Sequence, residues 1–310
     1  MKWLILGGTG KIGSRLISRL LQRGETVVLS TRSAPRKGEW RKGVWTVFAC
    51  DDEASPAFIE AFGNADILVN LAGEEIASHP WTEERKEEIV RSRVQTTSLL
   101  SFLMAHEGEN IPKVWLNASA VGIYGSGVGT AHEETPSVPS FLSETCQAWE
   151  AAVESPAGVR TAILRFGVVL MNEGGAFPKI QIPFRFGFGA WLGSGNQYFP
   201  WVHVHDAVEA ILQVARNPEA IGAINIVAPV EDSAKSFALA LNDAWGRPRI
   251  QMVPPFKCRW LGGLYRAMNG ERSVLALEGR PVSAEKLLGL GYRFQYPKAI
   301  DACSALLAST

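Results

Sequence analysis

The sequence predicts an α/β protein built on a doubly wound parallel sheet, with a smaller, discontinuous C-terminal lobe. Short apolar runs alternate with stretches of helical periodicity over most of the chain. The runs are apolar enough to be buried on both faces, as the strands of parallel sheets are. A glycine-rich loop joins the first run directly to the first helical stretch, which is the arrangement that opens this class of fold.

Seven apolar runs are expected to form strands. They occupy residues 2–8, 26–32, 44–49, 65–73, 113–125, 160–170 and 223–228. Between the first two strands a helix is predicted to end at Gly24, because a helical stripe is formed by Ile12, Leu16, Ile17, Leu20 and Leu21. Ser55 and Pro56 open a second helix as N-cap and first helical residue. A long helix begins at Thr82, with acidic residues in its first turn, and extends to about residue 105.

The pattern changes after residue 170. We predict a nucleotide-binding domain formed by residues 1–170 plus about 202–230, and a smaller lobe formed by residues 171–201 plus about 231–310. Residues 172–201 are rich in glycine, proline and aromatic residues. These aromatics, together with Arg185, suit a flat or apolar ligand that carries an anionic group, and they equally suit packing between the lobes. A small-molecule ligand is expected in the cleft between the lobes.

Composition excludes several classes of protein. Of the 310 residues 46% are hydrophobic, which is enough for a sizeable core. Lys plus Arg and Asp plus Glu number 31 each, so the basic excess of a nucleic-acid or anionic-membrane binder is missing. The sequence has no run of about 18 apolar residues and no signal peptide pattern. The four cysteines lie far apart, which fits free thiols in the reducing cytoplasm.

The loop "GGTGKIG" predicts the cofactor. Gly7, Gly10 and Gly13 lie between a strand and a helix, where the chain must turn tightly and approach a diphosphate without an intervening side chain. Lys11 and Ile12 of the same loop are expected at the cofactor. A Rossmann-type dinucleotide site follows from this context, whereas an isolated glycine triplet would be weak support.

The ends of the second and fourth strands refine this expectation. An NAD site usually places an acidic residue after the second strand, but this chain has Thr31 and Arg32. Arg32 can pair with a 2′-phosphate, which favours NADP(H), although a solvated arginine at a strand end is the alternative. Leu71 and Ala72 in "NLAG" are expected to lie against the ribose and phosphates; a simple strand-end turn would look the same.

The motifs "GGTGKIG", "NLAG", "GIYG" and "WVHVHD" resemble those of the extended short-chain dehydrogenase/reductases, the epimerase/dehydratase group. The segments "VNLAGEEI", "CQAWEAA" and "ALEGRPVSAEKLLGLGYRFQYP" are similar to an atypical branch labelled epimerase-family or cell-division-inhibitor-like oxidoreductases. The resemblance covers nearly the whole chain, and it implies NADP(H) binding and a C-terminal domain of unassigned role. It implies cofactor contacts at Thr31, Arg32, Leu71, Ala72, Glu88, Arg93 and Val169. For Glu88 and Arg93 an ordinary surface charge is the alternative.

This chain departs from the group at the residues that move the proton. Ordinary members use Ser, Tyr and Lys, and the matching positions here are Ala120, Cys146 and Glu150. Cys146 is either a buried structural thiol, in an apolar stripe of the helix, or a weak candidate proton donor. Tyr124 is a second weak candidate, and a pocket wall is the alternative. No standard Tyr-Lys acid/base chemistry is expected.

The motif "HVHD" raises the question of a metal. His203 and His205 could share a face of a strand, but no third ligand has a visible place, so no metal is expected. Asp206 is predicted to be the N-cap of the helix that follows. Two functions stay open. The chain is an NADP(H)-dependent oxidoreductase or epimerase-like enzyme of unknown substrate, or a non-catalytic NADP(H)-binding regulator of a partner such as the cell-division machinery.

Overall fold

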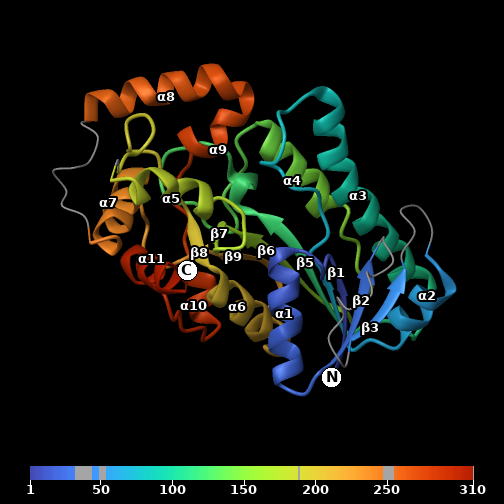
Figure 1. The fold of residues 1–310 in the computed structure, drawn as a ribbon. Coiled ribbons are helices and arrows are strands. Elements are labelled where there is room, and N and C mark those ends of the chain that lie inside the picture. Colours follow the sequence, from blue (N-terminus) through green and yellow to red (C-terminus); the bar gives the residue numbers. More distant parts are fainter. Residues whose placement is uncertain (32–43, 49–53, 188, 247–254, 310) are drawn as a thin grey trace.

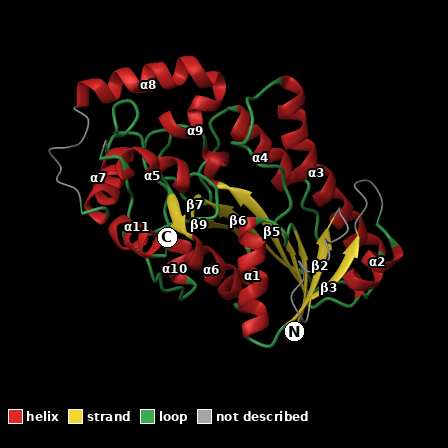
Figure 2. Ribbon diagram, viewed as in Figure 1, coloured by secondary structure: helices red, strands yellow, loops and turns green. Residues whose placement is uncertain are grey.

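The computed structural model describes residues 1–31, 44–48, 54–187, 189–246 and 255–309, with the backbone alone at 44–48 and 255–259. The main strands are β1 (Lys2–Leu6), β2 (Thr26–Thr31), β3 (Val44–Phe48), β4 (Ile67–Asn70), β5 (Val114–Ala120), β6 (Arg160–Phe166) and β9 (Gly222–Ile226). They form one parallel sheet in the order β3-β2-β1-β4-β5-β6-β9 (Figure 2). The predicted parallel α/β fold is therefore confirmed.

Helices cover both faces of this sheet (Figure 1). One face carries α1 (Lys11–Gln22) and α6 (Val204–Arg216), and the other carries α2 (Pro56–Gly63), α3 (Glu83–His106) and α4 (Phe141–Ala151). The N-caps of α2 and α3 are the expected residues, because Ser55 accepts from the backbone N–H of Phe58 and Thr82 from that of Arg85. None of the described helices is both long and apolar enough to cross a bilayer.

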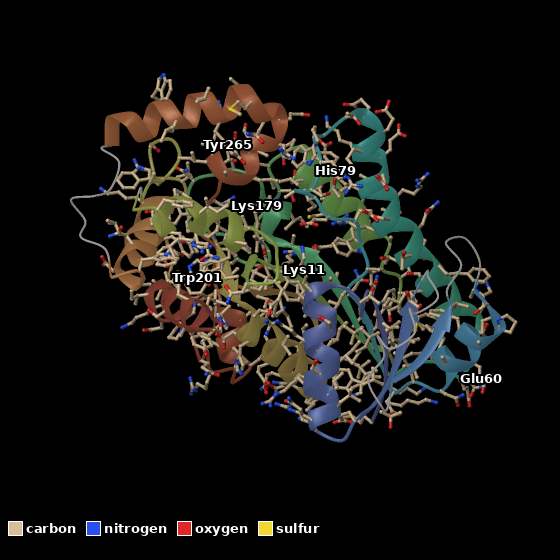
Figure 3. All side chains as sticks on the ribbon, viewed as in Figure 1. Lys11, Glu60, His79, Lys179, Trp201 and Tyr265 are labelled. Carbon is tan, nitrogen blue, oxygen red and sulfur yellow. The ribbon has the colours of Figure 1, made fainter. Side chains whose placement is uncertain are left out.

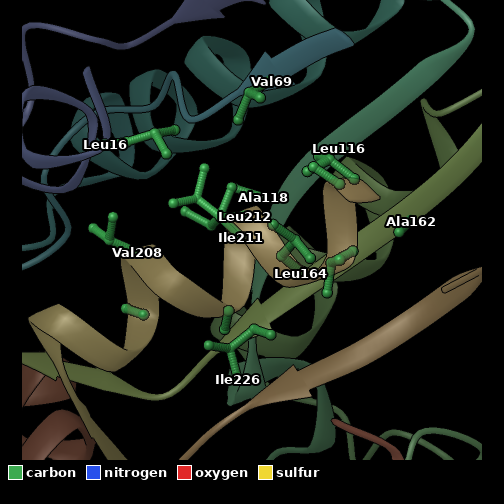
Figure 4. Close-up of a cluster of buried hydrophobic side chains, with 14 of the residues drawn as sticks. Leu16, Val69, Leu116, Ala118, Ala162, Leu164, Val208, Ile211, Leu212 and Ile226 are labelled. Atoms are coloured by element: carbon green, nitrogen blue, oxygen red, sulfur yellow. The ribbon is translucent and has the colours of Figure 1, made fainter. Parts of the chain in front are cut away.

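The main core lies between the sheet and the pair α1–α6 (Figure 4). It is filled by apolar side chains from α1 (Leu16), the sheet (Val69, Leu116, Ala118, Ala162, Leu164, Ile226) and α6 (Val208, Ile211, Leu212). A second cluster fills the opposite face and contains Phe58, Phe62, Leu100, Leu103 and Trp115. Because both faces are buried, the strands read as continuous apolar runs in the sequence.

A separate core beside the sheet is built by β7 (Val168–Leu170), α5 (Phe177–Arg185), β8 (Trp201–His203), α7 (Ala234–Ala244) and α11 (Ala299–Ala308). The other elements of this part are α8 (Pro255–Asn269), α9 (Val274–Leu277) and α10 (Glu285–Gly289), and Leu287 of α10 packs in the main core. The aromatics Phe177, Phe184, Trp191 and Trp201 are buried with α7 and α11, so they pack inside the predicted smaller lobe rather than between the lobes. Phe186 is 70% exposed. Phe188 lies outside the described residues. The domain boundaries proposed from the sequence stay a prediction.

The predicted strand over residues 160–170 divides at Gly167. The backbone N–H of Gly167 still bonds to Ile226 in β9, but that of Val168 bonds to Pro200. The ladder thus changes partner, and β7 pairs with β8 in a two-stranded sheet. A Cβ at Gly167 would lie 2.8 Å from the carbonyl oxygen of Pro200, so only glycine permits the change.

The predicted strand over residues 113–125 ends earlier than expected, at Ala120. A 3₁₀ turn, η1 (Val121–Tyr124), follows and carries Gly122 against Leu142 and Cys146 of α4. The turn brings the Tyr124 side chain into the interior, where it is fully buried. Sequence periodicity missed this because an apolar run has the same appearance in a strand and in a buried turn.

The prediction that Asp206 caps α6 was wrong. The N-cap is His203, and Asp206 is a fully buried residue of the first turn. Its carboxylate accepts from the Tyr292 hydroxyl at 2.8 Å and from the backbone N–H groups of Gln295 and Tyr296 at 2.8 and 2.9 Å. Asp206 therefore binds residues 292–296 of the C-terminal part to α6 through these hydrogen bonds.

Replacement of Asp206 by Ala should destabilise the protein strongly, because the buried Tyr292 hydroxyl and two part-buried backbone N–H groups would lose this carboxylate. We expect a loss of about 3 kcal/mol in the free energy of unfolding, measured by urea denaturation. Glu109→Ala, at an exposed site, is the matched control and should cost little. Equal losses for the two variants would contradict the role of Asp206.

Candidate functional site

The glycine loop after β1 packs backbone against backbone. Gly7 has a φ of 71°, and a Cβ on it would lie 2.5 Å from the carbonyl oxygen of Leu71 and 2.7 Å from the nitrogen of Ala72. A Cβ on Gly13 would lie 2.5 Å from the carbonyl oxygen of Gly7. Side chains at either position would push the loop away from β4 and α1, so the glycines have a structural necessity here.

The N-terminus of α1 is open. Gly10 is its N-cap and offers no side-chain acceptor, and the first turn has no acidic residue. By contrast α3 and α4 are capped by the side chains of Thr82 and Ser140. Lys11 is exposed at this end of the helix (Figure 3). The free N–H groups and the positive end of the helix dipole suit an anion such as a diphosphate.

The loop after β4 is fixed by its first residue. Asn70 is fully buried, and its Nδ2 donates to Oδ1 of Asn117 at 2.8 Å. Its own Oδ1 accepts from the backbone N–H of Ala72 at 3.1 Å. Leu71 and Ala72 are thereby held against Gly7, so the structure brings these three predicted contacts together.

Arg93 is a buried residue, so the alternative of a surface charge was wrong for it. Its guanidinium donates to the carbonyl oxygens of Ile89 and Glu74 at 2.8 and 2.9 Å, and it lies over the ring of Trp149. Burial lowers its pKa. A Cβ on Gly73 would lie 3.2 Å from this guanidinium. Arg93 thus stabilises the backbone of the loop after β4 by its hydrogen bond to Glu74.

Glu88 acts on the same loop through a neighbour. Its carboxylate accepts from Nη1 of Arg85 at 2.6 Å, and Nη2 of Arg85 donates to the carbonyl oxygen of Glu75 at 2.6 Å. The hydrogen bonds of Glu88 raise the pKa of Arg85. Arg93 thus contacts residue 74 directly, and Glu88 acts on residue 75 through Arg85.

Three other predicted contacts are Thr31, Arg32 and Val169. Thr31 ends β2, and Arg32 lies outside the described residues. Val169 is in β7, beside Gly175. The segment from β7 to α5 passes over α1, since a Cβ on Gly174 would lie 2.7 Å from Nζ of Lys11. The arrangement fits a dinucleotide. The N-terminus of α1 has no side-chain cap, and the backbone beside it is open only because the loop residues are glycines.

Residues 146 and 150 of α4 occupy the places of the Tyr-Lys pair. Cys146 is 6% exposed, and burial, followed by the charge of Glu150, raises its pKa to about 11. A thiol with this pKa is neutral at physiological pH and is a poor nucleophile. The structure therefore favours the structural interpretation of Cys146.

Glu150 forms a two-pronged ion pair with Arg165 of β6. Its Oε1 accepts from Nε of Arg165 at 2.9 Å and its Oε2 from Nη2 at 2.7 Å. The hydroxyl of Ser119 donates to Oε1 at 2.6 Å. Both charged side chains are about nine-tenths buried. Burial alone would lower the pKa of Arg165, but Glu150 outweighs it and raises this pKa.

Tyr124 belongs to the same network. Its hydroxyl donates to Oδ1 of Asn225 at 2.7 Å and accepts from Nη1 of Arg165 at 2.9 Å. Burial raises its pKa despite the nearby Arg165. With its hydroxyl engaged on both sides and no exposed surface, Tyr124 serves as a fixed part of the interior.

The sequence prediction missed Arg165 and Asn225. A signal was present, because Arg165 stands alone among apolar residues of a predicted buried strand, "RTAILRF". A buried charge needs a buried partner, and Glu150 was an acidic residue at a position where the family resemblance implies a lysine. In the described part of the chain no group of three or more His, Cys, Asp or Glu residues is arranged to hold a metal.

Comparisons with known proteins identify the family. Residues 3–156 match the NAD dependent epimerase/dehydratase family, and residues 263–306 match a domain of unknown function. An epimerase family protein of Staphylococcus haemolyticus is 33% identical over 306 residues, 95% of each chain. The chain belongs to the NAD dependent epimerase/dehydratase family. The resemblance seen in the sequence is thereby confirmed.

Two solved structures extend the family likeness to the whole fold. The human epimerase family protein SDR39U1 (isoform 2), crystallised with NADPH, is 29% identical with a TM-score of 0.84, and each chain is covered completely. A nucleoside-diphosphate sugar epimerase of Corynebacterium glutamicum is 27% identical with a TM-score of 0.77 and is covered over 58% of its length. Of these two relatives, the human protein binds NADPH in its crystal structure.

Removal of one partner of the buried ion pair should reveal its energetics. Arg165→Met leaves the Glu150 carboxylate buried without a counter-charge, and we expect a loss of about 3–5 kcal/mol in the free energy of unfolding. The double variant Arg165→Met/Glu150→Leu carries no unpaired charge and should lose clearly less. Urea denaturation of both variants measures this. A double variant as unstable as the single one would contradict the pairing.

Cys146 should resist alkylation. With a pKa of about 11, roughly one thiol in a thousand is ionised at pH 8, and the side chain is buried. We expect iodoacetamide at pH 8 to leave Cys146 unmodified in the native protein, as measured by peptide mass spectrometry, and to label it after unfolding in urea. Native labelling at the rate of a free cysteine would show an accessible, reactive thiol.

Proposed function

We propose that this chain binds NADP(H) with the diphosphate against the open end of α1, and that it is an oxidoreductase or epimerase-like enzyme without the standard acid/base. The observation that carries the proposal is the glycine loop: Gly7 has no room for a side chain beside Leu71 and Ala72, and α1 has no cap. Gly10, Lys11, Ile12 and Gly13 would hold the diphosphate. When bound, the cofactor supplies a hydride donor or acceptor.

The chain's own residues limit the chemistry. The position of the activating lysine holds a carboxylate that Arg165 neutralises, and the position of the tyrosine holds a buried thiol. The thiol is buried and the carboxylate is engaged by Arg165, so neither group is placed to exchange a proton with a substrate oxygen. In this proposal the proton that accompanies hydride transfer comes from the substrate or from solvent. The substrate is a small molecule that lies between the sheet and the C-terminal lobe.

The coenzyme is NADP(H) in this proposal. Arg32 follows β2 where an NAD site usually carries an acid, and the human relative was crystallised with NADPH. Free buried thiols at Cys146 and Cys303 fit a reducing compartment, and we place the protein in the cytoplasm.

Arg32→Asp tests the coenzyme choice. Loss of the cation and gain of an anion beside the 2′-phosphate should weaken NADPH at least about tenfold more than NADH. Calorimetric titration of both coenzymes measures the difference, with Arg91→Asp on the exposed side of α3 as control. Equal weakening of NADPH and NADH would mean that Arg32 does not contact the phosphate.

A second candidate is a non-catalytic regulator whose binding to a partner depends on NADP(H). The vacant Ser, Tyr and Lys positions, which hold Ala120, Cys146 and Glu150, favour it. Absorbance at 340 nm across a broad panel of carbonyl substrates separates the two. Turnover that persists in Cys146→Ser supports the enzyme. Silence across the panel, with a partner whose affinity changes on addition of NADPH, supports the regulator.

A further inference from the structure

A polar groove of about 430 Å³ lies at the end of α1 that is remote from the glycine loop. Its floor is the outer side of α6, and its walls are the last turns of α1 and the segment 291–295. Figure 1 shows α1 and α6 side by side, and Figure 3 labels Lys11 at the opposite end of α1. At a rise of about 1.5 Å per residue, Arg19 lies about 12 Å further along the helix than Lys11. The groove is thus separate from the nucleotide loop.

Positive charge predominates in the groove. Four arginines line it, namely Arg19, Arg23, Arg216 and Arg293. Two carboxylates line it as well, Asp206 and Glu209. Asp206 is fully buried and accepts only from neutral donors of the segment 292–296, so it keeps its negative charge and the lining holds four cationic against two anionic side chains. The groove therefore keeps an excess of cationic donors.

Glu209 organises two of the arginines. One of its oxygens accepts from Nε of Arg19 and the other accepts from Nη2 of Arg23, so a single carboxylate fixes two guanidinium groups. Arg216 is held in the same way by Glu25, whose other oxygen accepts from the N-terminal ammonium. Guanidinium groups that are already fixed lose less entropy when they bind an anion.

One arginine of the groove is unpaired in the part of the chain that the structure describes. Arg293 is exposed and forms no ion pair there. The Nδ1 atom of His205 is buried and has no hydrogen-bond partner among the described residues. Arg293 lines the groove and leaves hydrogen-bonding capacity for a ligand, whereas the His205 nitrogen is enclosed by protein atoms.

We propose that this groove is a second binding site, which takes the phosphate group of a small molecule. Arginines reach it from three elements, so they surround a tetrahedral anion better than a flat carboxylate, which one guanidinium fork can satisfy. The volume suits a small ligand, and the polar lining suits one that is phosphorylated and hydrophilic. The site does not require that the glycine loop binds a dinucleotide.

Calorimetric titration with inorganic phosphate in low-salt buffer tests the site. Arg293→Gln removes a groove arginine that makes no ion pair in the described structure, and Arg23→Gln removes one that Glu209 holds. Each should weaken phosphate about tenfold. Arg91→Gln, on the exposed side of α3, is the matched control and should bind phosphate as the wild type does. Thermal unfolding verifies that each variant is folded.

Three results would overturn the proposal. One is the absence of measurable heat for phosphate with the wild-type protein. Another is equal weakening by Arg91→Gln and Arg293→Gln, which would indicate general charge attraction. The third is loss of phosphate binding in Lys11→Gln alone, which would place the anion at the glycine loop. A parallel titration with citrate distinguishes the ligand classes, since binding of citrate in preference to phosphate would contradict a phosphate site.

Discussion

The close approach of two backbone segments at the carboxyl edge of the sheet is the constraint on which the candidate site depends. Gly7 can touch Leu71 and Ala72 only because it has no Cβ, and Asn70 fixes the second segment through Ala72 and Asn117. Backbone on both sides leaves a surface of amides and carbonyls, and the helix dipole of α1 adds positive potential.

Charged side chains that take no part in this backbone contact stabilise the loop beside it. Arg93 and Arg85 both donate hydrogen bonds to backbone carbonyl oxygens of the loop that follows β4, and Glu88 forms an ion pair with Arg85. A loop pinned by two guanidinium groups keeps the backbone cradle ordered before any ligand arrives. The family resemblance placed Glu88 and Arg93 at the cofactor, and in the structure both act on residues 74–75.

Local pattern was sufficient for the sheet and the glycine loop because both rest on short-range signals. Apolar runs, helix caps such as Ser55 and glycines at fixed spacing are all visible within a few residues. The missed features depend on distant partners. The strand breaks at Gly167 because Pro200 offers a new ladder partner, and Asp206 is buried because Tyr292 and its neighbours supply donors. The two members of each pair lie too far apart in the sequence for a local pattern to reveal them.

The charges of Glu150 in α4 and Arg165 limit the chemistry that this fold can support. In the ordinary arrangement a lysine places a net positive charge beside the reacting oxygen, and this charge favours a developing alkoxide. Here Glu150 and Arg165 cancel each other, and their hydrogen bonds are satisfied by each other, by Ser119 and by Tyr124. A neutral, fully bonded network cannot lower the energy of an anionic intermediate. Any hydride transfer on this frame must therefore suit a substrate that does not need a stabilised alkoxide, or one that brings its own proton.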